Sequence, residues 1–330
     1  MASMLRNLAL VFVTSLAGHV PAVAEQQLIL EDNPILPVPE QLQLDDRKVA
    51  LGEKLFHEPR LSSSGTMACS SCHFMNRSGD DERTTSITNT GEPDAFNTPT
   101  IFNIGLSHHI TWQGKYTRLE PQIDASLTNP KHMAADWEEL LGFLQNEPEY
   151  ARLFREIYQS ISSRDNVLDS IAEYERSLIT PNAPFDRWLK GDSTAIDQQA
   201  KEGYVLFREI GCIACHQGVN VGSNLFAPHG IFGDSHAEHH HQSSMEDLSR
   251  YSITGRERDK RVFRVPSLRN VAETGPWFHD GSAKQLSEAV LEMAEHQLGI
   301  KLLDDDTNKI VRFLESLTGI YRGKPVGDPK

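Results

Sequence analysis

The chain has 330 residues, of which 38% are hydrophobic and 24% are charged, and its formal net charge is −14 at pH 7. This length is enough for two domains. The acidic balance argues against nucleic acid as a partner, because phosphate binding requires a basic surface. An acidic surface can steer a basic protein partner towards the chain, or it can simply maintain solubility.

Residues 1–24 are typical of a secretory signal peptide. Arg6 precedes a mainly apolar stretch at 8–17, and the small residues Ala22-Val23-Ala24 form a cleavage site. We therefore expect cleavage near Ala24 and a periplasmic mature chain. No segment reaches the roughly 18 consecutive apolar residues of a membrane-spanning helix, so no membrane span is expected.

The mature chain is expected to begin extended and then to become helical. Three prolines between residues 34 and 39 oppose a helix in residues 25–44, and a helix is expected from Asp45 towards Phe56. Residues 58–135 are rich in Gly, Asn, Thr and Pro and are predicted to be mostly loop. Hydrophobic periodicity then predicts helices at about 136–146, 148–159 and 166–179.

Pro181 and Pro184 mark a boundary, after which a second helical unit is expected. Helices are predicted at about 195–209, 285–296 and 304–318, with a long polar loop at 217–262. No segment shows convincing strand alternation. The predicted fold class is therefore mostly α, with an N-terminal domain over residues 25–182 and a C-terminal domain over residues 183–330.

Every cysteine belongs to one of two copies of the motif Cys-x-x-Cys-His. The copies are Cys69, Cys72 and His73, and then Cys212, Cys215 and His216. This pentapeptide is the covalent attachment signature of a c-type haem, in which both thiols bind the porphyrin and the histidine reaches the iron. Paired cysteines also bind zinc or form disulfides. The histidine after each pair, the long gap between the pairs and the export signal favour two haems.

Each motif follows a predicted helix, which suggests two related modules with one covalently bound c-type haem each. His73 and His216 are then the proximal ligands of the two irons. The opposite face of each iron decides the function, because a methionine there favours electron transfer and an empty position leaves room for a substrate.

Several segments resemble the bacterial di-haem cytochrome c peroxidases, a family related to MauG. They are 56–62 (FHEPRLS), 97–100 (NTPT), 263–270 (FRVPSLRN), 277–281 (WFHDG) and 297–299 (QLG). The resemblance implies two cytochrome c-like domains, with part of the C-terminal tail packed on the first. It implies reduction of hydrogen peroxide at the N-terminal haem, with electrons from a small cytochrome c or a cupredoxin through the C-terminal haem. It is also compatible with a homodimer.

The resemblance assigns two residues to electron transfer. Met293 matches the sixth ligand of the C-terminal haem. Without the matching flanks it would be read as a core methionine, and Met245, in a polar loop, is the competing candidate. Trp112 matches a tryptophan that lies between the haems and relays electrons, whereas ordinary aromatic packing is the alternative.

The resemblance also implies one calcium ion at the interface of the two domains. Asn97 would bind it through a side-chain oxygen, and Thr274 and Pro276 through backbone carbonyls. Water would complete the shell of oxygen ligands that calcium prefers.

Two positions depart from the family pattern. Many members have a histidine after Thr-Ser-Ile that blocks the peroxidatic iron until the other haem is reduced, and here Asn89 stands at that place. The N-terminal haem is therefore expected to be open without reductive activation. The usual distal glutamate is replaced by His132, whose neutral imidazole can move the proton that O–O cleavage requires. Gln122 matches a further pocket position.

Two other functions stay open. A MauG-like enzyme would use peroxide to oxidise residues of a partner protein; Asn89 favours this function and Met293 opposes it, because MauG has a tyrosine there. A di-haem electron carrier would require two six-coordinate irons. The histidine-rich loop with His236, His239, His240 and His241 is interpreted as a solvated stretch, with metal binding as the alternative.

Overall fold

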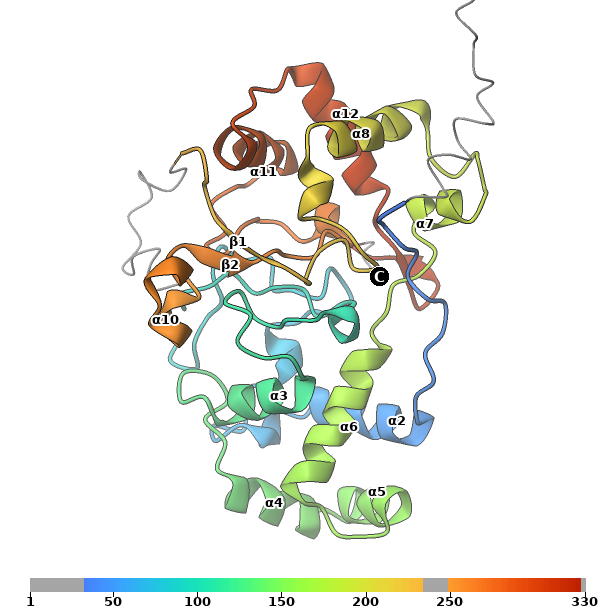
Figure 1. Cartoon of the computed structure of the whole chain (residues 1–330). Helices are drawn as coiled ribbons and strands as arrows, with labels where there is room; N and C mark the ends of the chain where they lie inside the picture. The colour runs from blue at the N-terminus through green and yellow to red at the C-terminus, as the bar shows by residue number, and fades with distance from the viewer. Residues whose placement is uncertain (1–32, 234–248, 328–330) are drawn as a thin grey trace, which may run out of the picture. The chain divides into compact units, whose positions relative to one another are not determined.

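Helices make up most of the regular structure, as the sequence predicts. The computed structural model describes residues 33–233 and 249–327. The predicted signal peptide, Met245 and the histidine-rich loop lie outside these residues. From Pro34 onward the chain forms one unit of contacts, coloured from blue to red in Figure 1. Among the described helices, none is both long and apolar enough to cross a bilayer.

The helices of the N-terminal half surround one hydrophobic core. They are α2 (Asp46–Phe56), α3 (Leu119–Thr128), α4 (Trp137–Asn146), α5 (Pro148–Tyr158) and α6 (Arg164–Ser177). α6 packs against α2 and α3 (Figure 1). α6 begins at a capping box, in which Ser163 accepts from the Asn166 N–H and Asn166 accepts from the Ser163 N–H. Val326 and Tyr321, near the end of the chain, pack into the same core.

Helix α3 lies inside the segment that was predicted to be mostly loop. Its residues Leu119, Ile123 and Leu127 recur every four positions and are all buried. This spacing is that of a helix face, but Pro121 in the first turn and the polar flanks obscure it in the sequence. Residues 58–135 are therefore mostly loop, as predicted, but they contain the α-helix α3, which was not predicted.

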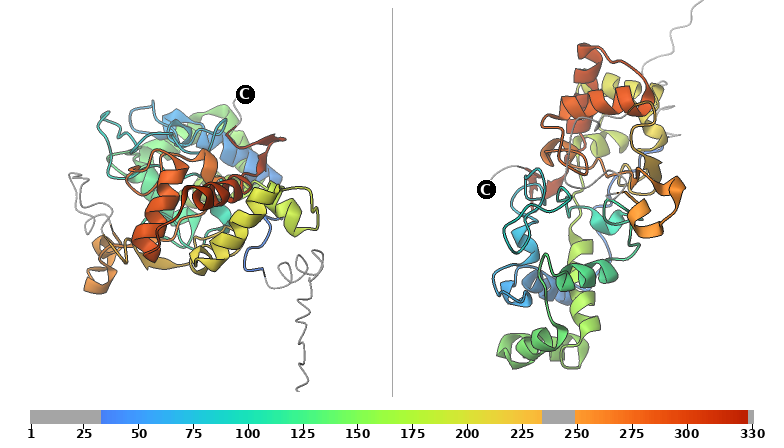
Figure 2. Two further views of the ribbon diagram at one scale, coloured as in Figure 1. Left: turned by 90° about the horizontal axis from the view of Figure 1, so that it is seen from above. Right: turned by 90° about the vertical axis from the view of Figure 1, so that its left-hand side faces the viewer.

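The C-terminal half has a core of aromatic side chains. Its helices are α7 (Pro184–Leu189), α8 (Gln198–Glu209), α10 (Tyr251–Thr254), α11 (Leu286–Glu292) and α12 (Asp304–Glu315). α8 packs on α12 so closely that a Cβ at Gly203 would lie 1.8 Å from the Lys309 carbonyl oxygen. Tyr204 of α8 meets Phe185 and Phe313 at ring-centroid distances of 4.9 and 5.1 Å. The two further views in Figure 2 show α8 and α12 side by side.

Short strands are present that the sequence did not predict. β1 (Phe226–Pro228) pairs antiparallel with β2 (Val262–Arg264), so that Ala227 faces Phe263. β3 (Ile320–Tyr321) pairs antiparallel with β4 (Lys324–Pro325). Strands of two or three residues are too short to show alternation.

A buried ion pair fixes the start of the described chain to the C-terminal half. Arg269 and Asp186 lie 2.7 Å apart and are almost completely buried. Arg269 also donates to the Leu36 carbonyl at 2.8 Å, and Asp186 accepts from the Val38 N–H at 3.3 Å. Residues 34–44 contain no helix, as predicted for the extended leader. The Leu36 carbonyl and the Val38 N–H bind the ion pair.

Candidate functional site

Both Cys-x-x-Cys-His motifs line one continuous cavity of about 980 Å³. Cys69, Cys72 and His73 come from the N-terminal half, and Cys212, Cys215 and His216 from the C-terminal half. The volume lies at the upper end of the range for small-molecule sites. The cavity therefore brings together motifs that lie far apart in the sequence.

The first motif forms a short 3₁₀ turn that orients His73. The Nδ1–H of His73 donates to the Gly79 carbonyl at 2.9 Å. Gly79 has a φ of +76°, and a Cβ there would lie 2.8 Å from the Phe102 ring, so the turn requires glycine. Burial lowers the pKa of His73, and the Gly79 carbonyl partly opposes this shift. The ring is thus held as a neutral imidazole, the form that binds metals.

The second motif has the same local form. Helix α8 ends at Glu209, two residues before Gly211, whose φ of +103° turns the chain into the 3₁₀ turn Cys212–Ala214. Burial lowers the pKa of His216 to about 4, and the carbonyls of Val221 and Pro266 partly offset this effect. His216 is therefore also neutral at physiological pH.

The four cysteines form no disulfide with one another. Burial raises the pKa of Cys69 and of Cys212 to about 12 and that of Cys72 to about 11. These thiols therefore lack the low pKa of a preformed thiolate site. Among the described residues, no group of three His, Cys, Asp or Glu side chains is arranged to hold a metal ion.

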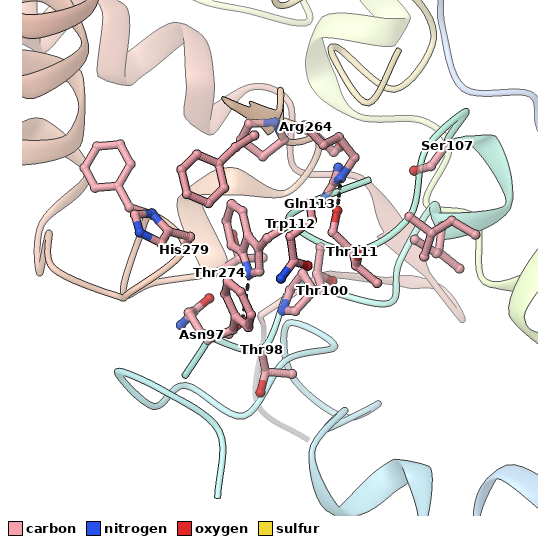
Figure 3. A pocket seen from close by; sticks show the side chains of 18 of the residues that line it. Asn97, Thr98, Thr100, Ser107, Thr111, Trp112, Gln113, Arg264, Thr274 and His279 are labelled. Atoms are coloured by element: carbon pink, nitrogen blue, oxygen red, sulfur yellow. Dashed lines mark hydrogen bonds between the residues drawn. The ribbon is translucent and has the colours of Figure 1, made fainter. Parts of the chain in front are cut away.

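Arg264 is a buried cation in the cavity wall. Its Nε donates to the Thr111 carbonyl at 2.8 Å, as Figure 3 shows, and its Nη1 donates to Ser223 Oγ at 2.9 Å. No carboxylate in the described part of the chain pairs with it, and burial lowers the pKa of the guanidinium to about 10. A buried unpaired charge is unfavourable, so a bound group that carries a carboxylate suits this wall. Haem carries propionate carboxylates, and the residues of the cavity therefore fit haem.

Trp112 lies where the two halves meet. Its Nε1 donates to the Asn97 carbonyl at 2.9 Å, and its ring meets that of His279 edge to face at 6.4 Å. The Arg264 N–H donates to the Trp112 carbonyl, and the Asn97 N–H donates to the His279 carbonyl, both at 2.8 Å. Figure 3 shows Trp112 between Asn97 and Arg264. Trp112, Asn97, Thr274 and Pro276 all line the cavity.

Met293 lines the C-terminal part of the cavity. It is half-buried and follows α11 directly, in a π-helical turn that runs from Met293 to Gln297. Such turns occur often at functional sites. The predicted helix at 285–296 is thus an α-helix that changes to a π-turn at the methionine that we expect to bind iron.

The predicted distal residues lie on two segments of the N-terminal half. His132 lines the cavity, and its Nε2 lies 2.8 Å from Asp94 Oδ2. Gln122, on α3, also lines the cavity and donates to Ser126 Oγ at 2.8 Å. Asn89 is exposed and outside the cavity lining, and it donates to the Pro130 carbonyl at 2.9 Å.

Three charged residues of this cavity were not predicted from the sequence. Asp94 and Arg264 carry no signal of their own, because their roles depend on contacts across the fold. Glu175 is 4% exposed on α6, its Oε2 has no hydrogen-bond partner among the residues that the structure describes, and burial raises its pKa to about 8. A glutamate on the apolar face of a predicted helix is a signal that could have identified Glu175.

The chain resembles known haem peroxidases over most of its length. A sequence profile of the di-haem cytochrome c peroxidases matches residues 46–194. Cytochrome c peroxidase Ccp of Escherichia coli is 40% identical over 291 residues, which are 88% of this chain and 62% of that protein. Cytochrome c551 peroxidase of Nitrosomonas europaea is 35% identical over 297 residues, which are 90% of this chain and 87% of that protein.

A solved structure shares the fold. The crystal structure of a MauG-like protein associated with microbial copper homeostasis matches with a TM-score of 0.74 and 26% identity, over 86% of this chain and 93% of that one. The fold is thus that of a MauG-like protein, and the cavity places both Cys-x-x-Cys-His motifs together inside it. The chain belongs to the di-haem cytochrome c peroxidase family, which confirms the resemblance found in its sequence. It spans 62% of the length of the E. coli relative.

Proposed function

We propose that the chain reduces hydrogen peroxide to water with electrons from a small cytochrome c or a cupredoxin. The observation that carries this proposal is the cavity, which holds both Cys-x-x-Cys-His motifs and places Trp112 at the junction of the two halves. Relatives at 35–40% identity are named cytochrome c peroxidases, which supports a peroxidase activity. Residues 1–24 would direct the chain to the periplasm and be removed.

Two haem c groups would be held by the two motifs, in domains over residues 25–182 and 183–330. Bound haem would supply the redox chemistry of O–O cleavage and the storage of electrons. His73 and His216 would each present a neutral imidazole to one iron, and Arg264 would neutralise a propionate. The packing of Val326 and Tyr321 in the N-terminal core supports a contribution of the C-terminal tail to that domain.

The two haem sites would differ in what faces the iron. Met293 would close the C-terminal iron to substrates. In the N-terminal half, Asn89 is hydrogen-bonded to the loop at Pro130 and does not line the cavity, which supports a site that is open from the start. His132 would take a proton from peroxide and return it to the departing oxygen, and Gln122 would hold the substrate.

Trp112 would provide the electron route between the two sites. Two contacts fix its indole: the Nε1–H donates to the Asn97 carbonyl, and the ring meets the His279 ring edge to face. A fixed aromatic ring at the junction shortens the gap that an electron must cross between the two halves.

A calcium ion would stabilise the same junction. Asn97 Nδ2 donates to the Arg83 carbonyl at 2.8 Å, which leaves the amide oxygen for a cation. Thr274 and Pro276 line the same cavity and would add backbone carbonyls. Such oxygen atoms are suitable calcium ligands.

The test is turnover of the purified, haem-loaded protein with hydrogen peroxide and a reduced small cytochrome c. Oxidation of two donor molecules per peroxide supports the proposal, because each donor gives one electron. The MauG-like alternative, favoured by Asn89 and by the fold match to a MauG-like protein, predicts little donor oxidation and oxidised side chains on a partner protein. Mass spectrometry of added partner proteins separates these outcomes.

A further inference from the structure

Asp94, His132 and Asn129 form a row of hydrogen-bonded side chains in the wall of the cavity. His132 Nε2 lies 2.8 Å from Asp94 Oδ2, and His132 Nδ1 lies 3.1 Å from Asn129 Nδ2. All three residues line the cavity that carries the N-terminal haem motif. Both ring nitrogens of His132 therefore have partners.

The backbone of Lys131 determines which atoms of this row donate. The Lys131 N–H donates to Asn129 Oδ1 at 2.9 Å, which fixes the oxygen side of the amide. The amide nitrogen must then face His132, and an amide nitrogen can only donate. His132 Nδ1 therefore accepts, and the proton of the neutral ring is on Nε2, which donates to Asp94.

One segment of the row is closed by a backbone hydrogen bond of its own, and a second backbone hydrogen bond joins it to the other segment. The Asp94 N–H donates to the Ser86 carbonyl at 2.7 Å, and the Asn89 N–H donates to the Lys131 carbonyl at 2.8 Å. Asn89 Nδ2 donates to the Pro130 carbonyl. The residue that replaces the family's blocking histidine thus holds the loop that carries His132.

Asp94 is an ionised partner for the imidazole. The hydrogen bond from His132 is the largest cause that lowers the pKa of Asp94, and Lys131 acts in the same direction. The Lys131 ammonium also lies near this carboxylate, 3.9 Å from Asp94 Oδ1. A carboxylate on one ring nitrogen stabilises the imidazolium that forms when the other nitrogen takes a proton.

We propose that Asp94 is the positioning residue of the distal base, and that it fixes His132 as the Nε2–H tautomer with Nδ1 as the proton acceptor. Where the family usually has a distal glutamate, this chain has His132. The carboxylate is supplied by Asp94, which is hydrogen-bonded to the His132 imidazole. This inference rests on the proposed function, because it gives His132 its role in peroxide reduction.

In the proposed step, one proton moves from hydrogen peroxide to His132 and then back to an oxygen of the peroxide. One O–H bond of hydrogen peroxide breaks and one N–H bond forms at His132 Nδ1, while Asn129 moves aside. Asp94 compensates the positive charge of the imidazolium. As the O–O bond breaks, the same proton returns to the departing oxygen, so that one water forms and His132 is neutral again. The other oxygen would become the second water with two electrons from the donor and two protons from solvent. No electron passes through these residues; the donor supplies both.

The test uses the haem-loaded protein in its oxidised form and follows the rate of cyanide binding against pH. Hydrogen cyanide must lose its proton to bind, so this rate reports the distal base without peroxide turnover. The variants are Asp94→Asn, His132→Gln and the double variant. The amide in Asp94→Asn can still accept from Nε2–H, so the loop stays tethered and only the charge is lost. Glu92→Gln, on the exposed turn before Asp94, is the matched control.

Each single variant is expected to slow cyanide binding by about 10- to 100-fold. This range ends at about 100-fold, where the usual contribution of general acid–base catalysis begins. The double variant should be no slower than His132→Gln. Unchanged rates in Asp94→Asn, or effects that multiply in the double variant, would overturn the inference.

The proposed function fails separately. One outcome is that the variants change the rate of cyanide binding as expected while the wild type does not oxidise a donor with peroxide. In that case the proposed function is wrong and the positioning role of Asp94 stands. If the wild type turns over peroxide and Asp94→Asn behaves like Glu92→Gln, the positioning role alone is wrong.

Discussion

The indole Nε1 of Trp112 donates a hydrogen bond to the backbone carbonyl of Asn97 at 2.9 Å. The Asn97 N–H in turn donates to the His279 carbonyl, so a residue of the N-terminal half connects the tryptophan to the C-terminal half. The aromatic ring at the junction is therefore held from both sides. This arrangement makes Trp112 the residue to test first for electron transfer between the haem sites.

Replacing Trp112 with phenylalanine should slow donor-dependent peroxide turnover by about tenfold, equivalent to about 1.4 kcal/mol of barrier. Phenylalanine retains an aromatic ring but loses the Nε1 donor and part of the π system. Stopped-flow spectroscopy of the reduced protein with peroxide measures the electron transfer. Trp137→Phe is the control, since Trp137 Nε1 binds only Asp124 on a neighbouring helix. Equal rates in both variants would remove the relay role of Trp112.

Each pair of cysteines should hold one haem independently. Replacing Cys69 and Cys72 with alanine should leave a protein whose mass exceeds that of the polypeptide by one haem, and so should replacing Cys212 and Cys215. The reason is that each motif forms its own local turn with its own histidine. Mass spectrometry under denaturing conditions measures the covalent haems. A wild type with fewer than two would contradict the assignment.

Glu175 should make the stability of the protein depend on pH. Burial raises its folded-state pKa from 4.5 to about 8, with Glu120 acting in the same direction and Arg176 opposing it. As the pH rises, Glu175 ionises in the unfolded chain before it ionises in the folded protein. The contribution of the protonated carboxyl group to the free energy of unfolding is therefore present below about pH 4.5 and is lost as the pH rises to about 8. The loss is on the order of 5 kcal/mol at about 1.4 kcal/mol per pKa unit.

Glu175→Gln removes this dependence. The variant and the wild type should melt at similar temperatures near pH 4.5, and the variant should be the more stable by several degrees at pH 8. Thermal unfolding of the haem-loaded proteins, followed by circular dichroism, measures the difference. A constant difference across this range would mean that Glu175 does not stay protonated in the folded protein.

The proposed calcium site predicts one bound calcium ion per chain that depends on Asn97. Asn97→Leu should lose this ion, because the side-chain oxygen is the only ligand that substitution can remove, and Thr274 and Pro276 would bind through the backbone. Elemental analysis after dialysis measures the metal. Asn146→Leu is the control, because the Asn146 side chain only binds the Gly142 carbonyl of its own helix. Calcium retained in Asn97→Leu would contradict the site.

The parts of the site that depend on short-range sequence could be predicted. His73 and its two cysteines lie within five consecutive residues, so the motif alone identifies them. The helices with clear periodicity, such as α6 and α12, were also predicted to within a few residues. Helix α3 was missed, because its buried residues Leu119, Ile123 and Leu127 stand among polar residues and a proline.

The remaining parts depend on contacts between distant segments. Asp94 is 38 residues from His132, and no local pattern indicates that their side chains meet. Arg264 belongs to a segment that resembles the family, but its lack of a carboxylate partner is a property of the folded wall. Family resemblance can align a residue, whereas only the fold identifies its hydrogen-bond partners.

The optical and electron paramagnetic resonance spectra of the fully oxidised protein test the difference between the two haem sites most directly. A methionine on one iron and an open position on the other predict one low-spin and one high-spin haem, together with peroxide turnover before any reduction. Two low-spin haems, with turnover only after one electron has been added, would contradict this account.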